Sequence, residues 1–207
     1  MKRYGMVLAL VGLVSLTATG RPDTETFEPD QNGYIRNWLV LAPIPLAEGQ
    51  SGLDGLNKVG VKDEGKITPK EGEEATVDGK KYTWKKYQST ESHLDFNEFL
   101  KEQKEDCVAY AVCYLWVQND VKNLKLLMGS DDQAKVWLNG DEVLKCEEAR
   151  PLAKDQDTAE NITLKAGRNV IVFKVVNEKI DFSGSIRFMD ASGAPFREFK
   201  VSCSPEK

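Results

Sequence analysis

Residues 124–144 read LKLLMGSDDQAKVWLNGDEVL and indicate the fold class of this chain. Apolar residues recur at every second position from Leu124 to Met128, and this period of two is typical of a strand with one face on a core. Gly129 to Asp132 then interrupt the pattern with residues that favour corners, because their side chains bond nearby backbone groups. The alternation resumes at Val136, so the stretch predicts two strands joined by a polar corner.

A tight turn follows the second of these strands. Asn139 and Gly140 both tolerate the positive φ angle that a type I′ turn requires, and this pair is a strong hairpin signal. A two-residue turn also sets the register, which places apolar side chains of both strands on one face. The expected pairs are Leu138 with Asp141, Trp137 with Glu142 and Val136 with Val143.

Short strand patterns recur along the rest of the chain. Residues 106–117 (DCVAYAVCYLWV) are apolar on both faces, which predicts a central strand covered on both sides. One short helix is expected within residues 94–104, and long N-terminal loops are expected mainly at residues 48–78. We therefore predict an all-β fold, a jelly-roll β-sandwich. Other strands and hairpins are expected at residues 34–45, 76–84, 162–176, 185–189 and 198–202.

Composition and charge limit the function classes. The chain has 207 residues, of which 41% are hydrophobic and 29% are charged, and these values are typical of an ordinary globular domain. The formal net charge is −5. A general nucleic-acid-binding protein carries a clustered basic excess, so we expect no nucleic-acid partner.

The N-terminal residues have the pattern of a secretory signal peptide. A basic start at Lys2 and Arg3 precedes the apolar run Met6–Leu16, and small residues follow at a cleavage position. The run is too short to span a bilayer comfortably and no cysteine follows it, so we expect no membrane attachment after its removal. The predicted division is a signal peptide at 1–20, a flexible leader at 21–33 and one β-sandwich domain at 34–203, in a bacterial protein that is secreted, periplasmic or part of the cell envelope.

Four cysteines, Cys107, Cys113, Cys146 and Cys203, allow up to two disulfides in an exported chain. Cys107 and Cys113 lie on the same face of one predicted strand, about 20 Å apart at the strand rise, and cannot bond each other. Each therefore needs Cys146 or Cys203 as its partner, or is a buried free thiol. The sequence leaves this pairing open.

Four aromatic residues are candidates for ligand binding. Tyr82, Trp84 and Tyr87 are close together in the sequence, and Trp137 lies on the strand face opposite the core residues. Such rings either stack on a sugar ring or pack over a sheet. Exposed rings on a concave face or loop rim would favour a sugar ligand. Burial of Tyr82, Trp84 and Trp137 would favour a structural role.

Five runs share a resemblance to one family: WLVLAPIP (38–45), DCVAYAVCYLWV (106–117), GSDDQAKVWLNG (129–140), LKAGRNVIVFKV (164–175) and GSIRFMD (184–190). They resemble jelly-roll domains of the galactose-binding-like superfamily, and more narrowly the sugar-binding-like domain of glycoside hydrolase family 2 proteins. Free-standing versions of this domain are typical of secreted planctomycete-type bacterial proteins. The resemblance covers about residues 38–190 and implies the fold more than the ligand. The hydrolase's catalytic barrel is absent, since these residues are too few to contain it.

The corner Ser130-Asp131-Asp132 is similar to one in the lectin-like domain of anthrax protective antigen, where paired aspartates bind calcium. This similarity implies Asp131 and Asp132 as candidate ligands of a structural calcium ion. Calcium takes about six to eight oxygen ligands, so two carboxylates form only part of a site. The alternative is a corner whose carboxylates accept hydrogen bonds from backbone N–H groups.

These observations predict a secreted, non-catalytic module that binds carbohydrate or assists polysaccharide handling, with a polysaccharide as its partner. The alternative is a structural or protein-interaction module of the cell envelope, with a protein partner and no sugar ligand. The sequence has no GxSxG, HExxH, P-loop or GxGxxG motif, so we assign no catalytic residue and expect no enzyme. His93 is the single histidine, and no nucleophile arrangement surrounds it.

Overall fold

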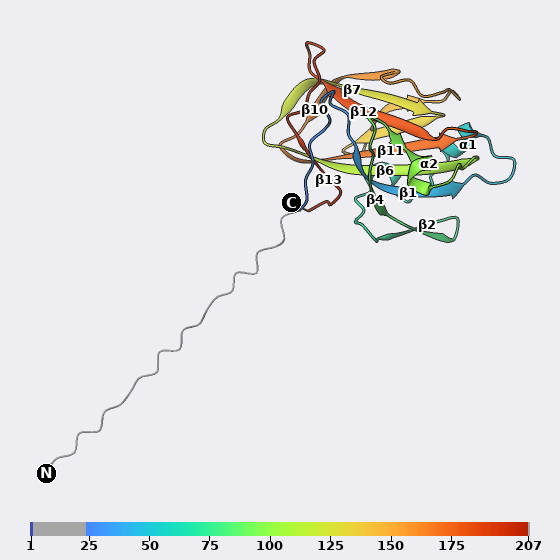
Figure 1. Ribbon diagram of the computed structural model, residues 1–207, viewed down its shortest axis with the longest axis horizontal. Coiled ribbons are helices and arrows are strands. Elements are labelled where there is room, and N and C mark those ends of the chain that lie inside the picture. Colours follow the sequence, from blue (N-terminus) through green and yellow to red (C-terminus); the bar gives the residue numbers. More distant parts are fainter. Residues whose placement is uncertain (2–23, 207) are drawn as a thin grey trace.

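The structure is a computed structural model that describes Met1 and residues 24–206. Figure 1 shows a sandwich of antiparallel β-sheets with a small two-stranded hairpin beside it. The predicted all-β sandwich is confirmed. The predicted signal peptide, residues 1–20, lies outside the described residues apart from Met1. Within the described part of the chain, no helix has the length and apolar character needed to cross a membrane.

The sandwich consists of a larger and a smaller sheet, in which all neighbouring strands are antiparallel. The larger sheet has the order β4 (Lys85–Gln88), β1 (Asn37–Pro45), β6 (Cys107–Val117), β11 (Gly167–Asn177), β8 (Ala134–Leu138) and β9 (Asp141–Cys146), with β13 (Lys200–Ser202) also paired to β6. The smaller sheet has the order β10 (Asp157–Leu164), β7 (Val121–Asp131), β12 (Ser183–Met189) and β5 (Leu94–Asp95).

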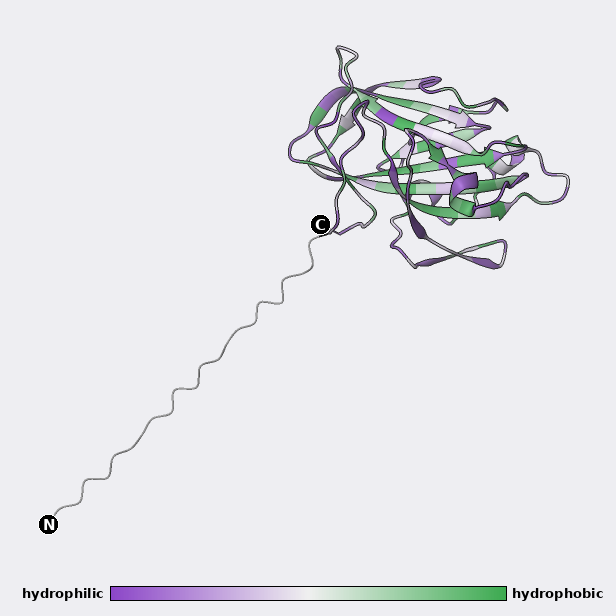
Figure 2. Cartoon of the chain, in the orientation of Figure 1, coloured by the Kyte–Doolittle hydropathy of each residue, from purple (hydrophilic) through white to green (hydrophobic). Residues whose placement is uncertain are grey.

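The main core lies between the two sheets and contains the alternating apolar residues of the predicted strands. Leu124, Leu126 and Met128 of β7 are buried in the same cluster as side chains of the larger sheet. Within this cluster Trp38 of β1 packs against Phe173 of β11, with ring centroids 6.3 Å apart. Figure 2 shows hydrophobic residues along the strands and hydrophilic residues in the connecting loops. The removal of this apolar surface from water is the main stabilising contribution to the fold.

The outer face of the larger sheet is covered by residues 46–84, which we call the cover segment. Leu56, Val77 and Trp84 of this segment pack with outward-facing side chains of β6, β8 and β11. The prediction that residues 106–117 are covered on both sides is therefore confirmed. The cover segment contains α1 (Gly52–Asn57), the 3₁₀ helix η1 (Glu64–Lys66), β2 (Glu74–Val77) and β3 (Lys80–Thr83).

Two short α-helices are present where the sequence predicts one. In α1 the Ser51 side chain accepts a hydrogen bond from the Asp54 N–H, and Asp54 bonds back to Ser51, which forms a capping box. The other helix, α2 (Phe96–Leu100), lies in the predicted stretch 94–104 and begins after the N-cap residue Asp95. Helix α1 lies in residues 48–78, a polar segment without an extended apolar period, where the sequence predicts a long loop that could contain a helical turn or a short strand.

The hairpin at Asn139-Gly140 has the predicted register next to the turn. A β-bulge then shifts the pairing by one residue, so that Val136 lies opposite Leu144 rather than Val143. A bulge inserts one extra residue into one strand, and turn chemistry alone does not predict it.

Residues 162–176 do not form the predicted hairpin. Strand β10 pairs with β7 in the smaller sheet, whereas β11 pairs with β6 and β8 in the larger sheet. Ile162 and Leu164 nevertheless point into the main core. The local alternation is the same for a hairpin and for a crossing between sheets, so only the tertiary pairing distinguishes them.

Residues 24–33 are bonded to the domain, in contrast to the flexible leader predicted at residues 21–33. Phe27 and Val201 exchange two backbone hydrogen bonds of 2.8 Å. Glu28 forms an ion pair with Lys200 at 2.5 Å. The sandwich therefore extends toward the N-terminus beyond the predicted boundary at residue 34.

The disulfide prediction is not supported, because Cys107, Cys113, Cys146 and Cys203 are all free and buried. They match the alternative of buried thiols. Burial raises the pKa of Cys107 and of Cys203 to about 12, and it also raises the pKa of Cys113. These thiols stay protonated at neutral pH and are therefore poor nucleophiles.

Candidate functional site

The acidic corner at the end of β7 is held by backbone hydrogen bonds. Asp131 Oδ2 accepts one from the Leu152 N–H at 3.2 Å. The carboxylate oxygens of Asp132 accept others from the N–H groups of Arg150 and Glu178, at 3.1 and 2.9 Å. Within residues 24–206 no group of three or more histidine, cysteine, aspartate or glutamate side chains is placed to hold a metal ion. The corner fits the backbone-bonded alternative and does not support the predicted calcium site.

A polar pocket of about 300 Å³ lies beside Asp131. Asp95, Asp181 and His93 also line it, and no lysine or arginine does. The pKa of Asp131 is raised from its ordinary 3.8 to about 6, mainly by burial and to a smaller extent by the charges of Asp132 and Asp181, while the Leu152 hydrogen bond opposes the shift. The pocket is therefore acidic and unsuited to an anionic ligand.

The raised pKa of Asp131 predicts a pH-dependent contribution to stability. Between about pH 4 and pH 6 the folded protein holds this proton more tightly than the unfolded chain, so stability falls as the pH rises. Asp131→Asn keeps an oxygen for the Leu152 N–H and removes the charge. We expect its unfolding free energy at pH 7 to exceed that of the unaltered protein by about 1–3 kcal/mol, with no gain at pH 4.

Urea denaturation at pH 4, 5, 6 and 7 measures this effect. Asp141→Asn, in the exposed part of the β8–β9 hairpin, is the matched control and should leave the pH profile unchanged. A destabilised Asp131→Asn protein at pH 7 would contradict the prediction.

A second polar group is buried between the larger sheet and the cover segment. Lys174 of β11 is 1% exposed, and its Nζ donates hydrogen bonds to the carbonyl oxygens of Leu56 and Lys58, at 3.0 and 2.6 Å. It also pairs with Glu64 Oε2 at 3.3 Å. The Tyr110 hydroxyl donates to the same carboxylate oxygen at 2.5 Å. Burial lowers the pKa of Lys174 to about 8, and the charge of Glu64 opposes that shift.

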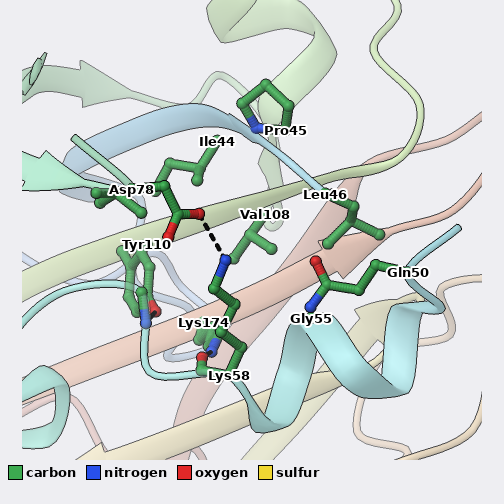
Figure 3. Close-up of a pocket in the computed structure, with 12 residues that line it drawn as sticks. Ile44, Pro45, Leu46, Gln50, Gly55, Lys58, Asp78, Val108, Tyr110 and Lys174 are labelled. Atoms are coloured by element: carbon green, nitrogen blue, oxygen red, sulfur yellow. Dashed lines mark hydrogen bonds and ion pairs between the residues drawn. The ribbon is translucent and has the colours of Figure 1, made fainter. Parts of the chain in front are cut away.

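Figure 3 shows the pocket beside these groups. Its volume is only about 20 Å³, and it is bordered by Tyr110, Lys174 and the 2.6 Å ion pair between Lys58 and Asp78. The donors of Lys174 already have protein partners, so they are not presented to a ligand. The arrangement fastens the cover segment to β11, and we assign it a structural role.

The predicted aromatic residues do not form one exposed surface. Trp84 and Trp137 are buried, with 2% and 7% exposure, in the cluster beneath the cover segment. Tyr82 is partly buried against the same cluster. Tyr87 packs at the edge of the main core, and its hydroxyl donates to Glu98 at 2.6 Å. By the criterion stated above, this face of the molecule favours a structural role.

An open groove lies at the other end of the sandwich, where the end of β6 meets the C-terminal segment. We call it the Trp116 groove, and it is formed mainly by Trp116, Gln118, Asn119, Arg197, Phe199 and Lys200. Its volume is about 640 Å³. Val121, the first residue of β7, also lines the groove, whereas Asp131 of the acidic corner is the last residue of the same strand. At the rise of a β-strand, these eleven residues separate the groove from the acidic corner by about 33 Å. Figure 1 shows the C-terminus and α1 at opposite sides of the domain.

The groove combines an apolar base with polar edges. Phe199 is buried and Trp116 is partly exposed, so the base presents aromatic surface. Gln118, Asn119 and Arg197 are exposed at the edges and supply hydrogen-bond donors and acceptors. Ligand sites commonly combine a mainly apolar surface with a few polar groups that fix orientation.

A second hollow of about 450 Å³ continues the Trp116 groove. Glu28 and Arg197 line both, so the two form one elongated depression. The continuation adds Gln31, Asn32 and Arg36. An elongated depression suits an extended chain better than a single small molecule.

Sequence reasoning misses this groove. Trp116 lies in the most apolar strand pattern, which predicts burial on both faces. Gln118-Asn119, directly after that strand, is the one local signal of a polar edge beside it. Arg197 and Glu28 lie far away in the sequence, so their position beside Trp116 depends on the tertiary fold.

No protein-family model matches this sequence, and no curated protein matches it. Among solved structures the chain is similar to a GH31 alpha-xylosidase from Xanthomonas citri, with 10% sequence identity and a TM-score of 0.33. The match covers 88% of this chain and 20% of the xylosidase chain, so this chain corresponds to about a fifth of that protein's length. A likeness of this strength carries no argument about ligand or activity.

Proposed function

We propose that this chain is an exported, non-catalytic module that binds carbohydrate in the Trp116 groove. The observation that carries the proposal is the partly exposed Trp116 at the base of an open groove with amide and guanidinium edges. An indole ring offers a flat apolar surface to the C–H face of a sugar, and amide and guanidinium groups bond its hydroxyls. The sequence resemblance to galactose-binding-like and glycoside hydrolase family 2 sugar-binding-like domains motivates the same function.

The non-catalytic part of the proposal has chemical support. The groove contains no cysteine, serine or histidine that would serve as a nucleophile with a base beside it. Its Glu28 forms an ion pair with Lys200, which favours the ionised carboxylate and lowers the pKa of Glu28. A general acid for glycoside cleavage requires a raised carboxyl pKa instead.

The second candidate is a structural or protein-interaction module of the cell envelope. The burial of Trp84 and Trp137 favours it, because two of the predicted sugar-stacking residues serve the core. The two candidates predict different behaviour for the Trp116 groove, since only the first requires it to bind a glycan.

Affinity electrophoresis through gels that contain neutral or acidic polysaccharides tests the carbohydrate-binding proposal. We expect retardation of the unaltered protein, and a loss of roughly tenfold in affinity for Trp116→Ala when one stacking contact is removed. Tyr82→Ala is the matched control, since it removes a partly buried aromatic residue on the β2–β3 hairpin. Thermal unfolding of both variants verifies that they are folded.

Two results would count against the proposal. Loss of binding in Tyr82→Ala but not in Trp116→Ala would move the site to the predicted Tyr82 surface. An absence of retardation on every polysaccharide would favour the protein-interaction candidate.

A further inference from the structure

The arginines of the elongated depression, like Arg168, form no ion pair in the described part of the chain. Within residues 24–206, the arginine ion pairs are those of Arg150 with Asp157 and Arg187 with Asp155. Arg36 and Arg197, which line the depression, are in neither. Neither guanidinium group therefore has a carboxylate oxygen within ion-pair distance among the described residues, although the charge of Arg197 acts on Glu28 and helps to lower its pKa.

Arg36 provides an independent indication of a ligand. Its Nε atom is buried and has no hydrogen-bond partner in the described part of the chain. A buried donor without a partner is energetically unfavourable. The side chain lines the depression, so a bound anion would give the guanidinium group an acceptor there.

The acidic residues of the depression are largely engaged elsewhere. Glu28 is paired with Lys200 at 2.5 Å. Asp30 Oδ1 accepts hydrogen bonds from the N–H groups of Asn32 and Tyr34, at 2.8 and 2.9 Å. Glu198 is an exposed carboxylate at the edge of the Trp116 groove. The depression is thus close to neutral by formal charge, and Arg36 and Arg197 are its cations that form no direct ion pair among the described residues.

We propose that the depression binds an acidic polysaccharide, with Arg36 and Arg197 each bonded to a carboxylate or sulfate group of the chain and Trp116 stacked on a sugar ring. This inference rests on the proposed carbohydrate-binding function and specifies its ligand class. A guanidinium group forms two parallel hydrogen bonds with a carboxylate or sulfate, which is stronger and more directional than its bond to a hydroxyl. The shared lining residues Glu28 and Arg197 let one extended chain occupy both hollows.

The test compares binding to polygalacturonate, to the sulfated galactan carrageenan and to the neutral galactan agarose. We expect the Arg36→Gln/Arg197→Gln protein to bind the acidic chains at least tenfold more weakly, since each lost charge-assisted hydrogen bond corresponds to roughly tenfold in affinity. Binding should also weaken as the salt concentration rises from about 0.05 M to about 0.5 M, because mobile ions screen the charges. Glu198→Gln should strengthen binding to both acidic chains.

Lys80→Gln/Lys81→Gln on the β3 hairpin is the charge-matched control, because both lysines are exposed and the net charge changes equally. It should bind as the unaltered protein does. Thermal unfolding of the arginine variant verifies its fold. The two acidic probes distinguish carboxylate from sulfate as the preferred group.

The outcomes separate this inference from the proposed function. Equal binding of neutral and acidic chains, reduced by Trp116→Ala but not by the arginine substitutions, would overturn only the acidic specificity. No binding of any chain would overturn both. Equal weakening by the lysine control would show a general charge effect and would also overturn the arginine assignment.

Discussion

Lys174→Met is expected to lower the free energy of unfolding by about 3–5 kcal/mol. The substitution leaves the carboxylate of Glu64 buried without its cation, and it leaves the carbonyl oxygens of Leu56 and Lys58 without this donor. A buried charge that loses its partner retains its desolvation penalty and loses the compensating attraction. Urea or thermal denaturation measures the loss.

A double variant tests the cause of that loss. Lys174→Met/Glu64→Gln removes both charges, so it should recover a substantial part of the stability lost in the single variant. Tyr110→Phe removes only the hydroxyl that donates to Glu64 and is expected to be milder, at about 1–2 kcal/mol. A Lys174→Met protein as stable as the unaltered one would contradict the structural role assigned to this cluster.

The same lysine predicts the sign of a pH effect. Burial lowers the pKa of Lys174 from its ordinary 10.5 to about 8, so between these values the unfolded chain binds more protons than the folded protein. The contribution of Lys174 to stability therefore increases as the pH rises through this window. The deficit of Lys174→Met relative to the unaltered protein should widen from pH 8 to pH 10. A deficit that narrows would show that the folded-state pKa is not lowered.

Trp137→Ala is also expected to destabilise the protein by about 3–5 kcal/mol, because it removes a large buried side chain and leaves a cavity. Trp137 is 7% exposed and packs in the cluster beneath the cover segment. A Cβ atom added at Gly65 would lie 2.6 Å from its indole ring, which shows how closely the backbone of η1 approaches it. The indole therefore holds the 3₁₀ helix against β8.

Denaturation of Trp137→Ala and Trp137→Phe measures this effect, with a smaller loss expected for phenylalanine because it refills part of the space. The same pair distinguishes a core residue from a sugar-stacking residue. If Trp137 is a core residue, the folded fraction of each variant should still be retarded in gels that contain the glycan. A fully stable Trp137→Ala protein that no longer binds glycan would restore Trp137 as a ligand-binding residue.

Local sequence patterns predicted the strands well because side chains alternate between the two faces of a strand. Residues 106–117 carry apolar side chains at both parities, and β6 is indeed buried on both sides. Asn139 and Gly140 adopt the positive φ angles expected of their turn. These features depend on neighbouring residues alone, so the sequence is sufficient to predict them.

Pairing between distant segments was not predictable in the same way. The pattern at residues 162–176 fits a hairpin, yet its two strands lie in different sheets. The bulge at Val136 and the bonding of Phe27 to Val201 likewise depend on long-range contacts. The same limit applies to the cysteines, whose spacing allowed disulfides although their side chains are buried free thiols.

The candidate site shows the division between sequence and tertiary structure most clearly. The sequence by itself determined only strand parity, which places Trp116 on the same face of its strand as Tyr114 and Trp137 on the face opposite the core residues of its strand. The pairing of β11 with both β6 and β8 places the two tryptophans in one sheet. Only the tertiary structure decided which of them is accessible. The cover segment lies over Trp137 through η1, whereas Trp116 remains partly exposed where β6 pairs with β13. Alternation fixes the direction of a side chain, but its exposure depends on what the rest of the chain packs against that face.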